Sequence, residues 1–290
     1  MRRASTCLAV LGSLAALSLP ATASAAPTVA FKLTAIPIPG FPHTGNIYGA
    51  GAAGLFEFTI KGTEYDEGHP APLVGVNVFF PKGTKINAKG FATCSTAALE
   101  AQGEKAIGTA ACPKNSQLTF QEPGASCFGA ILPCQPESPH TILTKESYAL
   151  GVVNLGHEAV EEKSRIVGVY APGNHLFFFS KGVTPALFEI ISNGTVSTGS
   201  TPITRTEVPL VDPVAGAPDA SVEKIVVYAG GAYKKGKKTT YYATVPRKGS
   251  CPKGGFPVKA ELTFANVADL PSRVPGETVV ANYKAPCPRK

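Results

Sequence analysis

Short runs of alternating or continuous apolar residues, separated by Gly, Pro and Asn, fill the chain from residue 26 onward. Residues 73–80 show the pattern most clearly, because Val74, Val76, Val78 and Phe80 fall on one face of an extended strand. A period of two residues is typical of a strand with one buried face. The pattern predicts further strands over residues 29–33, 55–60, 141–155, 165–171, 175–180, 187–191, 203–210, 222–229, 239–245, 257–266 and 278–283.

Turn residues support this division into strands. Residues 171–174 (Ala-Pro-Gly-Asn) predict a turn between two strands, and residues 192–195 (Ser-Asn-Gly-Thr) contain the Asn-Gly pair favoured in hairpin turns. Residues 230–238 are interpreted as the tip of a hairpin that joins strand 222–229 to strand 239–245.

Only residues 95–101, which follow Cys94, have the pattern of a helix, because hydroxyl residues precede good helix formers. Many short strands without alternating helices argue against an α/β fold. We therefore expect an all-β fold, an antiparallel two-sheet sandwich of jelly-roll or immunoglobulin-like type with one short helix. A single domain over residues 26–290 is favoured, with a split near residues 209–218 as the alternative.

Residues 1–25 have the organisation of a cleaved secretion signal. Arg2 and Arg3 precede an apolar stretch, and the residues Ala-Ser-Ala at 23–25 form an acceptable cleavage site. The apolar stretch is shorter than the roughly 20 residues that a membrane-spanning helix needs. We therefore expect secretion, to the extracellular space or the cell wall, without a transmembrane anchor.

Removal of residues 1–25 also removes Cys7 and leaves an even set of six cysteines. An even number of cysteines in an exported protein predicts disulfide bonds, although six cysteines allow many connectivities. The spacing does not resemble that of a zinc site, so no metal and no cofactor are expected. Proximity in the sequence favours the pairs Cys94 with Cys112, Cys127 with Cys134, and Cys251 with Cys287.

The net charge falls from +7 to +5 once Arg2 and Arg3 leave with the signal. This is too small for a nucleic-acid binder, but it fits a soluble protein that rests on an anionic cell surface. The one basic cluster consists of Lys234, Lys235, Lys237 and Lys238. Such a hairpin tip is able to attract a cell-wall or envelope polyanion, although lysines also keep hairpins soluble and block edge pairing.

The chain contains no complete catalytic motif. His157 and Glu158 lack the second His of a zinc-protease helix, and the Gly-x-Ser-x-Gly turn of serine hydrolases is absent. The chain has no Trp, which removes the commonest ring for stacking on sugars. Residues 177–179 are three Phe, which we expect to place two rings on a core and one outside.

Acidic residues are densest between residues 57 and 67, where they are followed by His69. A hydrolase would need two or more such groups to converge in a pocket, with His157 or His175 as the partner. A polar loop between two strands is the simpler interpretation. The acidic residues in question are Glu57, Glu64, Asp66 and Glu67.

Two stretches resemble exported, uncharacterised proteins of actinobacterial type. The first runs from Phe80-Pro-Lys-Gly through Cys94 to Cys112-Pro-Lys-Asn-Ser, and the second from Cys251-Pro-Lys-Gly-Gly-Phe to Ala285-Pro-Cys287. Together they cover roughly a quarter of the chain. The resemblance implies a secreted β-rich domain with bridges Cys94–Cys112 and Cys251–Cys287, and it implies no catalytic residues.

The chain departs from this family at two places. Phe256 stands where the family often has Trp, and the stretch with Cys127 and Cys134 looks like a local addition. These departures weaken any inference about a shared ligand.

These observations favour a secreted or cell-envelope-associated structural or binding protein without catalysis, whose ligand the sequence does not name. Two alternatives stay open. One is a secreted hydrolase with a dispersed carboxylate and His site. The other is a binder of acidic cell-wall polymers that acts through the Lys-rich hairpin.

Overall fold

A computed structural model describes residues 26–38, 41, 51–119, 146–156, 158–247, 249, 251–268 and 275–287. The regular structure of these residues is mainly strand, with one α-helix, α1 (Thr96–Gln102). The predicted all-β class and the single short helix are therefore confirmed. The strands are β1 (Thr28–Ile36), β2 (Ala53–Lys61), β3 (Leu73–Phe79), β4 (Lys85–Ile86), β5 (Tyr148–Asn154), β6 (Ala159–Ala171), β7 (His175–Gly182), β8 (Phe188–Ser197), β9 (Ile203–Glu207), β10 (Ser221–Ala229), β11 (Ala232–Lys235), β12 (Lys238–Tyr241), β13 (Ala243–Thr244), β14 (Phe256–Ala265) and β15 (Pro275–Ala285).

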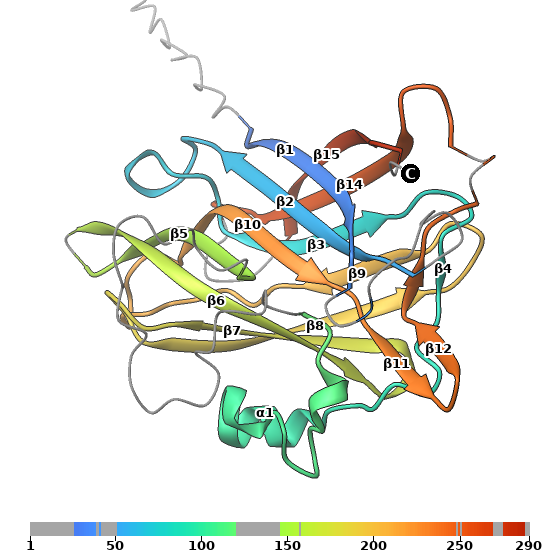
Figure 1. Ribbon diagram of the computed structural model, residues 1–290. Coiled ribbons are helices and arrows are strands. Elements are labelled where there is room, and N and C mark those ends of the chain that lie inside the picture. Colours follow the sequence, from blue (N-terminus) through green and yellow to red (C-terminus); the bar gives the residue numbers. More distant parts are fainter. Residues whose placement is uncertain are drawn as a thin grey trace, which may run out of the picture.

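Eleven strands form one antiparallel sheet in the order β1-β2-β10-β5-β6-β7-β8-β9-β3-β14-β15 (Figure 1). The sheet curls until β1 and β15 lie side by side, with the rings of Phe31 and Tyr283 6.4 Å apart, so that it is nearly closed into a barrel. Because all neighbours are antiparallel, the first and eleventh strands run in the same direction. No hydrogen-bonded ladder joins them within the described residues.

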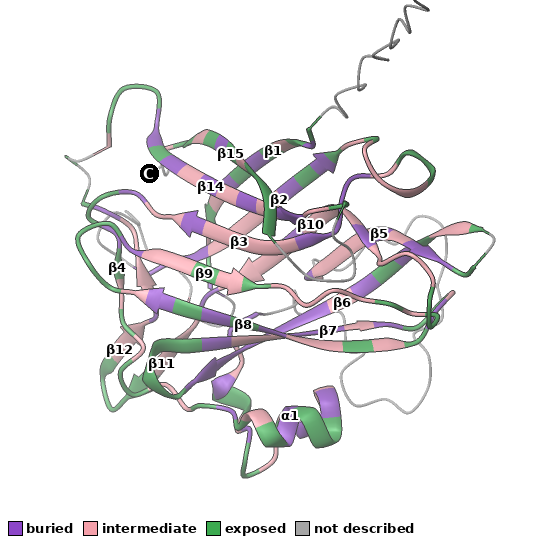
Figure 2. Cartoon of the chain, turned by 180° about the vertical axis from the view of Figure 1, so that it is seen from behind, coloured by how far each residue is buried: buried purple, intermediate pink, exposed green. Residues whose placement is uncertain are grey.

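The expected division into two sheets is not confirmed, because these eleven strands share one ladder of hydrogen bonds. The alternation of apolar residues indicates which face of a strand is buried, as the alternating burial along β14 illustrates (Figure 2). It does not indicate which strand lies beside which, and a sandwich and a curled single sheet bury the same faces.

The connections between neighbouring strands fall at two opposite ends of the barrel. One end carries residues 62–72, 155–158, 183–187, 208–220 and 266–268. We call it the acidic end, because the described carboxylates of the connections gather there. The opposite end carries residues 80–91 and 230–249, with β4 and β11 to β13, and we call it the lysine end. In Figure 1 the acidic end is on the left and the lysine end on the right.

A register shift in β3 changes which of its residues face the interior. Between β3 and β14 the pairing moves from Gly75 with Thr263 to Leu73 with Phe264. Leu73 therefore joins the buried core together with Val76 and Val78, and it takes the place that simple alternation gives to Val74. The prediction was correct for Val76, Val78 and Phe80 and wrong for Val74, because alternation cannot anticipate a bulge.

The predicted turns have different outcomes. Residues 171–174 do connect two antiparallel strands, β6 and β7. Residues 192–195 lie inside β8, where Asn193 pairs with Phe177 and Gly194 pairs with Leu176, so the predicted hairpin turn is wrong. Gly194 fits this strand because a Cβ there would lie 3.3 Å from the Leu176 side chain, which is a tight contact.

The barrel interior is densely packed on the side formed by β1, β2, β3, β14 and β15. Phe58, Leu262 and Phe264 form the centre of this core, and the small Ala260 and Ala281 allow the strands to approach. We call this group the packed core.

The segment around α1 covers the outer face of β6 to β8 (Figure 1). Its Leu99, Ala98 and Ala106 are buried against Val169, with Phe177 and Ile191 packed beside them. This part of the sheet is therefore apolar on both faces. The pattern of residues 177–179, with three consecutive Phe, follows from that arrangement.

Residues 117–119 occupy the same strand position as β5. The Leu118 N–H donates to the Gly168 carbonyl at 2.7 Å, and the Gly230 N–H donates to the Leu118 carbonyl at 2.9 Å. The short segment thus lies between β6 and β10, where β5 itself continues from Tyr148 onward. Residues 120–145, which include Cys127 and Cys134, lie outside the described residues, and their two flanks meet in one strand of the sheet.

Candidate functional site

The barrel contains a cavity of about 290 Å³ on the side opposite the packed core. Its wall is formed mainly by apolar side chains of β2, β3 and β5 to β10. Several of these residues, such as Phe56, Phe178 and Ile190, point into the barrel but keep partial solvent exposure, because no side chain fills the space in front of them. The cavity was not predicted, since sequence alternation does not distinguish a filled interior from an empty one.

A small set of hydroxyl groups interrupts the apolar wall. Ser164, Ser180 and Ser192 face the cavity from β6, β7 and β8, and Thr204 and Thr206 face it from β9. Apolar pockets with a few polar groups are typical of small-molecule sites, in which the polar groups orient the ligand. The inward serines also explain why the outer and inner faces of β7 and β8 are hard to tell apart in the sequence.

Glu162 is the one carboxylate in the cavity wall among the described residues, and its side chain is buried. Its two carboxylate oxygens accept hydrogen bonds from the N–H of Val183 at 3.1 Å and of Ala186 at 3.0 Å. These two hydrogen bonds compensate for the burial of the Glu162 carboxylate and hold the turn between β7 and β8. Glu162 therefore acts as an anchor for this turn.

Aromatic rings close the cavity at the lysine end. The Tyr170 ring lies 4.7 Å from the Tyr242 ring and 4.8 Å from the Phe91 ring, all measured between centroids. Burial raises the pKa of both the Tyr170 and Tyr242 hydroxyls above the usual value. Among the described residues, the buried Tyr170 hydroxyl has no hydrogen-bond partner. At the acidic end, the wall residues Val208, Leu210 and Val211 are partly exposed, and we expect ligand access there.

The buried tyrosines predict a loss of stability in alkaline solution. Burial, followed by the charge of Asp219, raises the pKa of Tyr65 to about 12. The folded state therefore holds these protons more tightly than the unfolded state, in which the pKa of tyrosine is about 10. The contribution of these protonated hydroxyls to the stability of the fold is complete below about pH 10, and we expect it to be lost as the pH rises toward about 12.

Urea denaturation at increasing pH measures this loss. The variant Tyr242→Phe lacks one of the titrating hydroxyls and should lose less stability over the same range. An ionisation of all nine tyrosines at the pH of free tyrosine, with the fold intact, would contradict the prediction.

The acidic residues singled out from the sequence only partly converge. Asp66 and His69 lie at the acidic end, where Asp66 accepts a hydrogen bond from the Asn154 amide at 2.7 Å and His69 Nδ1 lies 3.1 Å from the Glu223 carboxylate. Glu64 accepts a bond from the Ala71 N–H at 2.6 Å. These partners are structural, and none of the three residues lines the cavity.

The other groups of the hydrolase hypothesis lie elsewhere. Glu57 is on β2 between Phe56 and Phe58, which face the interior, and it therefore points outward. His175 begins β7 at the lysine end, and His157 lies outside the described residues. The convergence that this hypothesis requires is thus not formed by Glu57, Asp66, His69 and His175. No group of three or more potential metal ligands occurs in the described part of the chain.

The four predicted lysines lie on a local hairpin whose strands differ from the expected ones. Residues 222–229 form β10, which pairs with β2 and β5, whereas β11 and β12 pair only with each other. Lys234 and Lys235 are on β11, Lys238 is on β12, and Lys237 is in the turn between them. All four are exposed. The hairpin tip was correctly predicted, but its strands were not, because residues 239–245 bend into β12 and β13.

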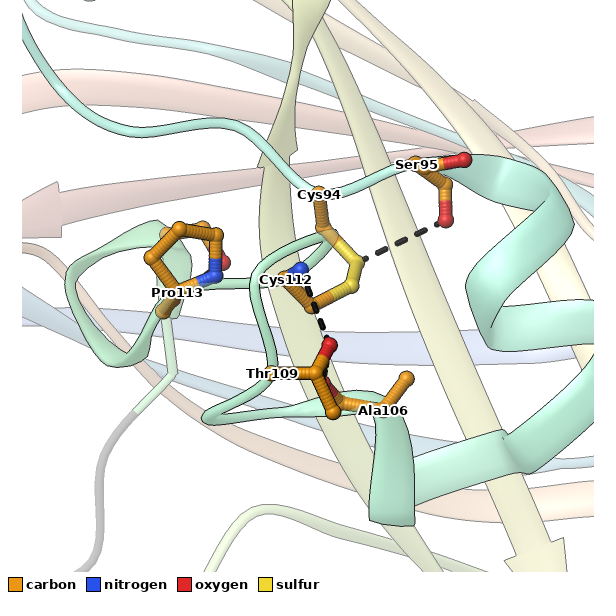
Figure 3. The surroundings of a disulfide bond; sticks show 7 residues. Cys94, Ser95, Ala106, Thr109, Cys112 and Pro113 are labelled. Atoms are coloured by element: carbon orange, nitrogen blue, oxygen red, sulfur yellow. Dashed lines mark hydrogen bonds between the residues drawn. A yellow bond between two sulfur atoms is a disulfide. The ribbon is translucent and has the colours of Figure 1, made fainter.

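Two of the three expected disulfides are present. The third expected pair, Cys127 and Cys134, lies outside the described residues. Cys94–Cys112 joins the start of the α1 segment to its end and is buried under β6 (Figure 3). The Thr109 hydroxyl accepts a bond from the Cys112 N–H at 3.3 Å and donates to the Ala106 carbonyl at 2.7 Å. Cys251–Cys287 closes the open end of the β14–β15 hairpin.

No family model matches the chain, and comparisons with curated proteins and with solved structures found no similar protein. In the part of the chain that the structure describes, no helix has the length and apolar character needed to cross a membrane.

Proposed function

We propose that the chain is a secreted, non-catalytic binding protein that holds an apolar small molecule inside its barrel. The observation that carries this proposal is the cavity of about 290 Å³, whose wall is almost wholly apolar. An apolar protein cavity of about 150 Å³ stays dry and binds benzene. The present cavity is larger and approaches the lower limit of about 300 Å³ for pockets that hold drug-sized ligands.

The chemistry of the wall indicates the class of ligand. The hydroxyls of Ser180, Ser192 and Thr206 offer hydrogen bonds but no charge, and the Glu162 carboxylate already accepts two N–H bonds. A charged ligand would lose its hydration without finding an ionic partner, which is costly. A ten-carbon chain gains about 0.8 kcal/mol per buried CH₂ before binding costs, which is compatible with a dissociation constant of roughly 1–100 µM.

Disulfides and the predicted signal support export. The bridges Cys94–Cys112 and Cys251–Cys287 are compatible with an oxidising compartment. A carrier outside the cell would protect an apolar compound from water during its transfer. Turnover of ester, peptide or glycan substrates by the purified protein would contradict a non-catalytic role.

A single tryptophan tests the binding site directly, because the chain contains no Trp. Phe178 lines the cavity, whereas its neighbour Phe177 packs on the opposite face of β7 against the α1 segment. We expect bromodecane, whose bromine quenches indole fluorescence on contact, to quench the Phe178→Trp variant saturably. The matched Phe177→Trp variant should show only the weak quenching of a Trp outside the cavity.

A second substitution separates binding in the cavity from binding on the surface. Thr206→Phe, introduced into the Phe178→Trp chain, fills space in the cavity and is expected to abolish saturable quenching while the circular dichroism spectrum is kept. Equal quenching of the two Trp variants, or unchanged quenching with Phe at 206, would refute the proposal.

A further inference from the structure

Two long segments without acidic residues meet at one end of the barrel. Residues 68–99 and residues 224–260 contain no Asp or Glu, although they lie far apart in the sequence. The first segment carries Lys82, Lys85 and Lys89, and the second carries the four lysines of the β11–β12 hairpin. Only the hairpin lysines form a cluster in the sequence itself, because the two segments are separated by more than a hundred residues.

Specific contacts hold the two segments together. β4 pairs with β13, with Lys85 opposite Thr244 and Ile86 opposite Ala243. The Asn87 N–H donates to the Tyr242 carbonyl at 2.7 Å.

Tyr233 fastens the hairpin itself to residues 80–91. Its hydroxyl donates to the Lys89 carbonyl at 3.1 Å, and its ring meets the Phe91 ring edge-on with centroids 5.0 Å apart. Phe91 in turn contacts the buried rings of Tyr170 and Tyr242. The backbones that carry the lysines are therefore fixed to the barrel interior rather than free to separate.

Seven lysines are exposed on this surface, and none of them forms an ion pair within the described residues. Like charges held close together repel one another and raise the local positive potential. We call this group the lysine patch. It consists of Lys82, Lys85, Lys89, Lys234, Lys235, Lys237 and Lys238.

The opposite end of the barrel has the opposite charge. The described residues of its connections include six carboxylates and no Lys or Arg, so the modest net charge of the chain conceals a separation of charge along the barrel. An anionic partner would be attracted to one end and repelled by the other. The six residues are Glu64, Asp66, Glu67, Glu158, Asp212 and Asp219.

The distribution of apolar residues argues against a membrane as the partner. Among the described large apolar residues, those exposed in connections are Leu155, Val183, Leu187, Val214 and Val267, which all lie at the acidic end. The aromatic rings beside the lysine patch are instead partly or fully buried. Proteins that bind bilayers combine basic residues with apolar side chains that insert between lipids, and the described part of the lysine end offers only the charges.

We propose that the lysine patch docks the protein onto a linear polyanion of the phosphate-polymer type. Lysine binds phosphate as a point charge, without the fixed bidentate geometry of arginine, which suits repeated phosphates along a flexible chain. Two adjoining rows of lysines, on residues 82–89 and on the hairpin, match a partner with charges repeated along an extended chain. When the protein docks at this end, the acidic end faces away from the polymer. The expected ligand entrance to the cavity lies at the acidic end and therefore stays open.

The decisive experiment removes lysines outside the hairpin. The mature, disulfide-bonded chain is titrated into fluorescently labelled long-chain inorganic polyphosphate, and anisotropy reports binding. The triple variant Lys82→Gln, Lys85→Gln and Lys89→Gln keeps the hairpin intact and is expected to weaken binding roughly tenfold to a hundredfold. Added salt should weaken binding of the unaltered chain more steeply than that of the variant.

A matched control removes the same charge elsewhere. Lys32→Gln, Lys61→Gln and Lys224→Gln alter β1, β2 and β10, outside the lysine patch, and should change affinity less than about threefold. Equal losses in the two triple variants would show that net charge alone drives binding and would overturn the proposal. Circular dichroism confirms that both variants are folded.

Two further probes test the identity of the partner. Tighter binding to phosphatidylglycerol vesicles than to polyphosphate would overturn the proposal in favour of a membrane. Equal binding to polyglutamate of matched charge would overturn the preference for phosphate. Because bromodecane binding at Phe178→Trp is measured independently, failure of the polyanion proposal leaves the proposed cavity function intact, and the reverse also holds.

Discussion

Leu262→Ala is expected to lower the free energy of unfolding by about 3–5 kcal/mol, because it empties space in the packed core. Leu262 is fully buried on β14, where it pairs with Val76 of β3 and Val279 of β15. Neighbours held by two strand ladders have little freedom to move into the space. Urea denaturation of the oxidised chain, fitted with a common slope, measures the change.

The matched variant is Ile190→Ala in the wall of the cavity. Ile190 is only partly buried and already faces empty space. Its truncation therefore removes some buried apolar surface but creates no new void. The free energy of unfolding is expected to fall by about 1–2 kcal/mol. Equal losses at residues 190 and 262 would mean that the interior is packed equally on both sides. That result would remove the basis of the cavity proposal, whichever ligand is used as a probe.

The double variant Cys251→Ala with Cys287→Ala is expected to lose about 3–4 kcal/mol in the chain-entropy account, because the bridge links residues 36 positions apart. The bridge closes the end of the β14–β15 hairpin next to Gly255, whose φ of +108° is unfavourable for other residues. A Cβ there would also collide with the Ala285 carbonyl oxygen, so this tight geometry is already specified by the sequence. Thermal unfolding of the variant against the oxidised parent measures the loss.

Reducing agent provides the control for this pair. It should destabilise the parent by breaking both bridges and the double variant only by breaking Cys94–Cys112, so the difference in stability between the two chains should largely disappear. An oxidised double variant as stable as the parent would show that the hairpin ladder alone fixes β15.

The predicted strands agree largely with those observed, because period-two alternation reports a property that each strand carries by itself. Val76, Val78 and Phe80 were placed correctly on the inner side. The errors occur where neighbours decide, as at Val74, where β14 imposes a bulge, and at Asn193, where pairing with Phe177 draws an Asn-Gly pair into β8. The same limit applies to the choice between two sheets and one, which depends on the order of strands.

The candidate site was less predictable than the fold. Phe178 in the cavity wall is flanked by Phe177 and Phe179, and no pattern of polarity marks which of the three lies inside. The hairpin lysines were visible as a local cluster, but Lys82 and Lys89 join them only because β4 pairs with β13. The sequence did contain a signal, because residues 68–99 and 224–260 both lack acidic residues. This signal becomes informative only when the fold shows that the two segments are adjacent.

The odd number of strands in the curled sheet has a consequence for solubility. A sheet of eleven antiparallel strands cannot close with an antiparallel pair, and within the described residues no hydrogen-bonded ladder joins β1 to β15. Exposed strand edges recruit the edges of other molecules and lead to aggregation. Here the two edges lie against each other along the seam, and each obstructs the approach of a foreign strand to the other. We expect this seam to limit edge-to-edge self-association of the barrel.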